Sequence, residues 1–335
     1  MILITILFLI LTGCILTHSQ LSLSYAYAGL ELWFKKMIPS LLPFMILSGI
    51  MVRLQLTEKI SMLIYPLVRP LFRVRKNVCY CMLIGFLCGF PMGARTAAQL
   101  YGQGGLTERE ASYLLAFCNN IGPVYFCSFA LPLLGRRLVL PYLFGMYGIP
   151  LLYGLILRFT VFRCLDLTFC KSTGTASFGC PANIPGPEGA PRKRILPRRK
   201  ELRVCSEESR GGRLLLALDE SIRSSIQGIL TLGGYMILFN LLNLLPHILL
   251  GHPLTLLAPA LEITGGLSML GPALPLYSLL MLSFGGLCCI AQTYSSIRDT
   301  GLSTGAYIFH KALLTLFNGG FYLLWYLTGP ASFLC

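Results

Sequence analysis

The sequence predicts an all-α integral membrane protein made of two inverted repeats that contain re-entrant or broken helices. Of its residues, 55% are hydrophobic and only 12% are charged. A soluble domain of this composition would leave much apolar surface in water, whereas a bilayer accepts that surface directly. Apolar segments are also interrupted by Gly89-Phe90-Pro91-Met92-Gly93 and, 196 positions after Gly89, by Gly285-Gly286. Unwound backbone at membrane depth needs protein or a watery cavity to satisfy its polar groups, so paired interruptions mark a candidate binding site.

Residues 1–30 are expected to form an N-terminal transmembrane segment. The stretch 1–17 is apolar and no Lys or Arg precedes it, which favours a retained span over a cleaved signal peptide. Leu11-Thr12-Gly13-Cys14 has the form of a bacterial lipoprotein cleavage box, but an ordinary helix end gives the same four residues easily. The intact mass of the protein distinguishes lipidation at Cys14 from an unmodified chain.

The first repeat is predicted over residues 31–158. We expect a full span at 38–56, a hairpin at 79–100 that enters the membrane and returns, and spans at 111–131 and 138–157. Pro91 lacks a backbone donor and the flanking glycines lack side chains, so one helix should end near Cys88 and the next should begin near Met92. The unpaired amides of that new helix favour an anionic or hydrogen-bond-accepting group.

A basic linker, rich in proline and glycine, is predicted over residues 159–213. Its bases are densest between Arg192 and Arg203, and bases beside apolar segments follow the positive-inside pattern. We therefore place the linker in the cytoplasm, with anionic lipid headgroups as its expected contact. Although the net charge is +14, the bases do not lie on an aromatic-bearing domain, so no nucleic-acid partner is expected.

The second repeat is predicted over residues 214–329, with Gly285 aligned on Gly89. The loop after the first full span is basic, whereas its counterpart at 261–267 has no base, so the two halves are expected to face opposite sides of the membrane. In this path a second hairpin lies at 276–294, and Asn318-Gly319-Gly320 interrupts the last segment as Asn119-Asn120 does in the first half. Arg136 and Arg137 then lie outside, against the charge rule.

Polar residues inside apolar segments are the candidate solute ligands. An unpaired carboxamide in lipid costs several kcal/mol, so Asn119 and Asn120 must bond to backbone, to the opposite hairpin or to a solute. Glycine and alanine near Thr96 would also permit close helix packing, one asparagine could simply hold the kink, and Glu262 could be a solvated helix cap. His310 is expected to be a core or interface histidine, and Arg95 could either line the cavity or extend to the interface. The candidate set is Gly89, Phe90, Pro91, Met92, Gly93, Thr96, Gln99, Asn119, Asn120, Glu262, Gly285, Gly286, Gln292 and Asn318.

Catalysis, a cofactor and a metal site are not expected. The chain has no G-x-S-x-G, no H-E-x-x-H and no Walker-type loop. Most of the thirteen cysteines lie in apolar segments, where cysteine behaves as a small hydrophobe, and the linker cysteines lack paired zinc-ligand spacing.

The motifs at 85–95, 106–111 and 117–123 resemble the nucleoside-recognition or Gate domain. With 39–44, 261–266 and 283–287, they are more narrowly similar to the YlbJ family of sporulation integral membrane proteins. The resemblance implies two Gate-type repeats, an architecture like that of concentrative nucleoside and ferrous-iron transporters, and a part in spore cortex formation in a Gram-positive spore former. The first break departs from the family pattern in Phe90 and Met92, and nucleoside binding is implied by the domain name alone.

The expected function is a transporter or permease-like protein for a small polar or anionic solute, which is not an enzyme. The alternative is a membrane scaffold that holds other sporulation proteins through the basic linker. We expect it in the bacterial inner membrane or the membrane around the forespore. Its expected partners are the solute, membrane lipids, and a second copy of the chain or other sporulation membrane proteins.

Overall fold

The computed structural model describes residues 2–163 and 210–328, and over these residues every regular element is a helix. The part of the linker between them, with its basic cluster and cysteines, lies outside the described residues. Within those ranges, 4 helical segments are long and apolar enough to cross a membrane: Ser19–Arg53, Arg136–Phe159, Gly211–Leu250 and Pro275–Ile297. The prediction of an all-α, multi-pass membrane protein is confirmed.

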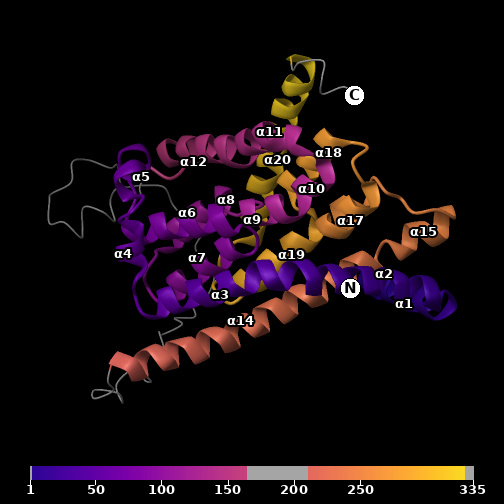
Figure 1. Ribbon diagram of the computed structural model, residues 1–335, viewed down its shortest axis with the longest axis horizontal. Coiled ribbons are helices and arrows are strands. Elements are labelled where there is room, and N and C mark those ends of the chain that lie inside the picture. Colours follow the sequence, from indigo (N-terminus) through magenta and orange to yellow (C-terminus); the bar gives the residue numbers. More distant parts are fainter. Residues whose placement is uncertain (1, 164–209, 329–335) are drawn as a thin grey trace.

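The N-terminal helices lie against the helix that follows the linker (Figure 1). After α1 (Ile2–Thr17), helix α2 (Ser19–Leu32) continues through a π-helical turn, η1 (Trp33–Met37), into α3 (Ile38–Arg53), and α14 (Arg210–Leu241) runs along both. Small residues permit this close approach, because a Cβ added at Gly29 would lie 3.0 Å from the Cα of Ile237. The indole of Trp33 donates to the carbonyl of Ile229 at 2.9 Å.

A tight helical hairpin follows the short helices α4 (Thr57–Ser61) and α5 (Tyr65–Phe72). Its arms are α6 (Lys76–Cys88) and α7 (Met92–Gly102), so the predicted end near Cys88 and start near Met92 are confirmed. Gly89 has φ 72°, a left-handed conformation that favours glycine, and the Phe90–Pro91 peptide is cis. A Cβ at Gly93 would come within 3.2 Å of the Cα of Gly85, which shows how closely the arms approach.

The next helix is broken. Helix α8 (Glu108–Phe117) begins with a capping box in which Thr107 and Glu110 bond to each other's backbone amides. It unwinds over 118–122 and resumes as α9 (Pro123–Tyr125), η2 (Phe126–Ala130) and α10 (Leu131–Leu134). The elements η3 (Arg136–Leu138), α11 (Val139–Leu143), η4 (Phe144–Gly148) and α12 (Ile149–Phe159) then form the last crossing segment of the first half.

The second half contains the same kinds of elements. After α14 come α15 (Leu244–Leu250) and a short hairpin made of α16 (Ala258–Leu261) and α17 (Ile263–Leu270), with Glu262 at its tip. Helices α18 (Pro275–Phe284) and α19 (Gly286–Ile297) follow, separated by a break at Gly285, and α20 (Thr304–Thr328) ends the described chain. In Figure 1 the broken helices lie between α11–α12 on one side and α2, α3 and α14 on the other.

Each half has a long helix, short helices, a hairpin, a broken helix and a final helix. Both aligned glycines follow the end of a helix, Gly89 at the tip of a hairpin and Gly285 at a kink. The alignment of Gly89 on Gly285 stays a prediction. The opposite orientation of the halves stays a prediction.

Two expectations for the second half are corrected. The segment 276–294 is not a hairpin like the first one, because Pro275–Ile297 forms a single 23-residue apolar segment, kinked at Gly285, that is long enough to cross. In addition, α20 runs unbroken through Asn318-Gly319-Gly320. Glycine in a helix costs only about 1 kcal/mol relative to alanine and does not by itself break one.

Candidate functional site

In the first half, the hairpin tip packs directly on the unwound part of the neighbouring helix. The amide of Phe90 donates to the carbonyl of Asn120 at 2.9 Å. A Cβ added at Gly89 would lie 2.3 Å from the amide nitrogen of Gly122, so only glycine fits there. Backbone groups that have no helical partner at the hairpin tip are thus partly satisfied by the unwound part of the neighbouring helix.

In the second half, the hairpin tip and the helix break meet in the same way. A Cβ added at Gly286 would lie 3.1–3.3 Å from the carbonyl oxygens of residues 259–261. Glu262 caps α17, since its carboxylate accepts from the amides of Thr264 at 3.0 Å and Gly265 at 2.6 Å, and from Nδ2 of Asn240 at 3.0 Å. Glu262 is 2% exposed, so it is a helix cap as the alternative held, but a buried one rather than a solvated one.

The breaks of the two halves touch each other at the centre of the molecule. The Phe90 ring packs on Gly285, where an added Cβ would lie 2.8 Å from the ring. Nδ2 of Asn119 donates to the hydroxyl of Thr293 on α19 at 2.9 Å. The hydroxyl of Tyr125 on α9 donates to that of Thr264 on α17 at 3.1 Å. The interruptions predicted from sequence are therefore brought together in space.

Lys311 on α20 completes this centre, although it was not among the site residues predicted from sequence. Its Nζ donates to the carbonyl of Asn119 at 3.1 Å and to Oδ1 of Asn120 at 3.0 Å, and lies 4.3 Å from the centroid of the Phe90 ring. The residue is 2% exposed. A lysine in an apolar helix that has no Asp or Glu is visible in the sequence and indicates a buried cation. The neighbouring His310 is half-buried, and its ring nitrogen lies 2.6 Å from the hydroxyl of Tyr153.

The two adjacent asparagines have different roles. Asn120 holds the kink, because its Nδ2 donates to the carbonyl of Phe117 at 2.7 Å. The Oδ1 of Asn119 is buried and has no hydrogen-bond partner, and it faces Gly93 across the hairpin. One asparagine therefore secures the kink, as the alternative held, but the other is only partly free, because its Nδ2 donates to Thr293 and to Tyr307. Contact of either one with a solute stays a prediction.

Two cavities adjoin the breaks. The larger has a volume of about 400 Å³ and lies between α7, α14 and α19, with polar side chains from all of them. The smaller, of about 40 Å³, lies at the breaks themselves and has room for about one water molecule. Gln292 and Leu232 line both cavities, so they mark the boundary between them. The polar residues of the larger cavity are Arg95, Gln99, Ser224, Gln227, Thr231, Tyr235, Gln292, Ser295, Ser296, Arg298, Asp299 and Thr300.

The candidate residues fall into groups in the structure. Those that line a cavity are Phe90, Pro91, Gln99, Glu262 and Gln292. Those that form or pack the breaks are Gly89, Gly93, Asn119, Asn120, Gly285 and Gly286. Those that line neither cavity are Met92, Thr96 and Asn318. Met92 is a core residue, and the hydroxyl of Thr96 lies 3.4 Å from that of Ser48.

Several cavity residues were absent from the candidate set. Arg95 points into the protein instead of the interface, since its Nη2 donates to the carbonyl and hydroxyl of Ser224 at 2.6 and 2.8 Å. Gln227 and Thr231 lie on the face of α14 that meets the hairpin. Their four-residue spacing places them on one helix face, but which helix that face meets is not encoded locally.

Comparisons with known proteins agree with this picture. Residues 34–138 match the family model described as Gate, nucleoside recognition. The chain is 33% identical over 123 residues to the sporulation integral membrane protein YlbJ of Bacillus subtilis (strain 168), an alignment that covers 37% of this chain and 30% of that protein. No solved structure matches. The resemblance to the Gate domain is confirmed for the first repeat, and the chain is a multi-pass membrane protein whose residues 34–138 match the nucleoside-recognition family model.

Proposed function

We propose that this protein is a sporulation-associated, transporter-like membrane protein that binds a small polar solute in the cavity of about 400 Å³ beside its helix breaks. The observation that carries the proposal is the meeting of broken helices from both halves at one buried polar centre, next to that cavity. Discontinuous helices that face each other between repeats are the usual place for solute sites in secondary transporters. Similarity to the sporulation integral membrane protein YlbJ supports the link to sporulation, and the part in spore cortex formation is proposed from the family resemblance alone.

The lining of the cavity sets the class of solute. Gln99, Gln227 and Gln292 each offer both a donor and an acceptor, and several serine and threonine hydroxyls surround them. Arg95 is bonded to the neutral Ser224, and Arg298 pairs with Asp299 at 3.5 Å, so the charged lining residues sum to one positive charge. This arrangement favours a polar solute with several hydroxyl or amide groups, and the positive charge also suits an anionic one. The volume lies within the range of small-molecule sites, and a nucleoside meets these requirements.

The breaks supply a means of movement. A hairpin tip and a helix break that touch through the Phe90 ring and Gly285 can separate without unfolding a helix, because the bends already exist. Gln292 lies at the boundary between the larger cavity and the breaks, so a solute bound there would contact the element that must move. Alternate exposure of the cavity to the two sides would then require rearrangement at the hairpin tip of the first half.

A binding experiment tests the proposal. Full-length protein in detergent is screened by thermal shift against nucleosides, nucleotides and cell-wall precursors, and any hit is followed by uptake into proteoliposomes. Gln292→Ala should weaken binding of the hit about tenfold or more, because it removes two hydrogen bonds of about 1 kcal/mol each. The matched control is Gln103→Ala, at an exposed glutamine just beyond the end of α7, another helix that lines the cavity. Equal affinity in the Gln292→Ala and Gln103→Ala proteins would rule out this cavity.

A genetic experiment separates transport from the scaffold function. Under the transport proposal, Gln292→Ala impairs sporulation at normal membrane abundance, whereas deletion of 192–203 has little effect. Under the scaffold function the order reverses, since the basic linker would carry the contacts. Sporulation efficiency and quantitative immunoblots of membranes give the two readouts.

A further inference from the structure

We propose that the ammonium group of Lys311 is the resident cation of the broken helix α8–α9, bound to oxygens that would otherwise hold a monovalent metal ion such as Na⁺. The inference concerns how the buried centre is held together, and it stands whether or not the protein moves a solute.

The oxygens come from the point where α8 unwinds. The last carbonyls of a helix have no partners within it and carry the negative end of the helix dipole. Here the helix ends at Phe117, and the oxygens of Asn119 and Asn120 just beyond it accept from Lys311 at 3.1 and 3.0 Å. Carbonyl oxygens at the unwound part of a membrane helix are a usual site for coupling cations.

The other surroundings of Nζ also favour a positive charge. The Phe90 ring lies 4.3 Å away, within the range of a cation–π contact. Among the residues that the structure describes, no ion pair includes Lys311, so neutral oxygens and the ring compensate its charge without a carboxylate. A buried charge without such compensation would be very costly.

The lysine joins the two halves of the molecule. It belongs to α20 of the second half, and its ligands belong to the hairpin tip and the broken helix of the first half. An exchangeable ion at this point would make closure of the centre depend on the ion concentration. A tethered ammonium gives the same compensation permanently, so the centre should not respond to Na⁺.

The test compares two substitutions of the same residue in the purified full-length protein. Lys311→Ala leaves both the oxygens and the space for an ion with water, whereas Lys311→Met fills the space with an apolar chain. Unfolding temperatures are measured in NaCl and in choline chloride at constant ionic strength. We expect no Na⁺ effect in the wild type, a rise of at least about 3 °C in Lys311→Ala between 1 and 100 mM Na⁺, and no rise in Lys311→Met.

Other results would overturn the proposal. A Na⁺-dependent rise in the wild type would mean that the lysine does not occupy the cation position. A folded Lys311→Ala protein that ignores Na⁺ would mean that the oxygens need no cation, as would Lys311→Met with wild-type stability. In both of these cases the lysine would act only as a neutral donor.

A second pair of variants decides the matter if Lys311→Ala does not fold. Asn120→Asp and Asn243→Asp both remove a buried amide donor to a helix carbonyl, but only Asn120 lies beside the lysine. If Lys311 is a cation, the new carboxylate pairs with it, and Asn120→Asp lowers the unfolding temperature less than Asn243→Asp does. An equal or larger loss in Asn120→Asp would refute a charged Lys311.

Discussion

Two interruptions in this protein, the break after α8 and the hairpin tip before α17, are stabilised by charges of opposite sign. In the first half, the backbone carbonyl of Asn119 and the side-chain oxygen of Asn120 lie just beyond α8, and a lysine from the other half donates to both. In the second half, the start of α17 presents amide hydrogens, and Glu262 at the hairpin tip accepts from them. The C-terminus of a helix carries a partial negative charge and the N-terminus a partial positive one, so each interruption has the charge that suits the helix end beside it.

The comparison also shows a difference in how local each solution is. Glu262 is adjacent to the amides it caps, so α17 can form with its cap in place. Lys311 is about 190 residues from its ligands, so the first break is completed only when the two halves have packed together. The contacts of Lys311 therefore depend on the packing of the two halves, whereas those of Glu262 depend only on local helix formation.

The largest effect on stability is expected at the local cap. Glu262→Ala removes three hydrogen bonds to a buried carboxylate and leaves their donors unpaired, so it should destabilise the protein by about 3 kcal/mol or more. Glu262→Gln keeps an acceptor for one amide and should cost about half as much. Reversible unfolding in detergent measures both changes. Equal stability of the Ala and Gln variants would contradict a cap that acts through its hydrogen bonds.

A smaller effect is expected where the two halves touch. Gly285→Ala places a methyl group 2.8 Å from the Phe90 ring and also forces alanine into a left-handed conformation at φ 82°. Gly251→Ala is the matched control, because Gly251 has the same left-handed conformation, φ 74° and ψ 0°, but nothing within 4 Å of an added Cβ. We expect a loss of about 1 kcal/mol for Gly251→Ala and about 1–2 kcal/mol more for Gly285→Ala. If the two variants lose the same stability, contact between the breaks contributes nothing.

The parts of the site that sequence could predict are those determined by neighbouring residues. Gly89 and Pro91 end one helix and start another through their own backbone restrictions, and the structure has both boundaries within a residue of the expected positions. The membrane class follows from composition in the same direct way. The charge of Lys311 was visible in the sequence, but its ligands were not, because they depend on contacts across the whole chain.

The differences in the second half have a physical cause as well. Glycine serves equally at a hairpin tip, at a kink and within an intact helix, so the glycines alone did not show that 276–294 is kinked and that α20 is continuous. Glu262 was open between a cap and a ligand because both require a carboxylate near a break. Only its hydrogen bonds to Thr264 and Gly265 distinguish these roles.

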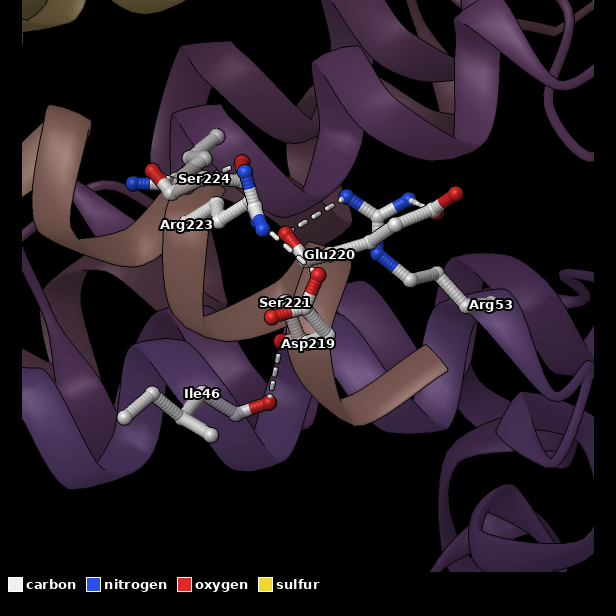
Figure 2. Close-up of polar contacts among 8 residues, drawn as sticks. Ile46, Arg53, Asp219, Glu220, Ser221, Arg223 and Ser224 are labelled. Carbon is white, nitrogen blue, oxygen red and sulfur yellow. Dashed lines mark hydrogen bonds and ion pairs between the residues drawn. The ribbon is translucent and has the colours of Figure 1, made fainter. Parts of the chain in front are cut away.

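The smallest effect is expected for a charge pair far from the breaks, and it gives the baseline for the comparison. Arg53 on α3 donates to the carboxylate of Glu220 on α14 at 2.9 Å, beside the hydrogen bond from Ser221 to the carbonyl of Ile46 at 2.7 Å (Figure 2). The Glu220 side chain is 62% exposed, so water and salt screen the pair. A double-mutant cycle of Arg53→Ala and Glu220→Ala should give a coupling of about 0.2–1 kcal/mol, decreasing with added salt. The effect of Glu262→Ala should exceed this coupling several-fold, because burial and helix-end geometry, rather than charge alone, determine the stabilisation at the breaks. If the coupling energy of Arg53 and Glu220 were as large as the loss in Glu262→Ala, burial and helix-end geometry would not explain the stabilisation at the breaks.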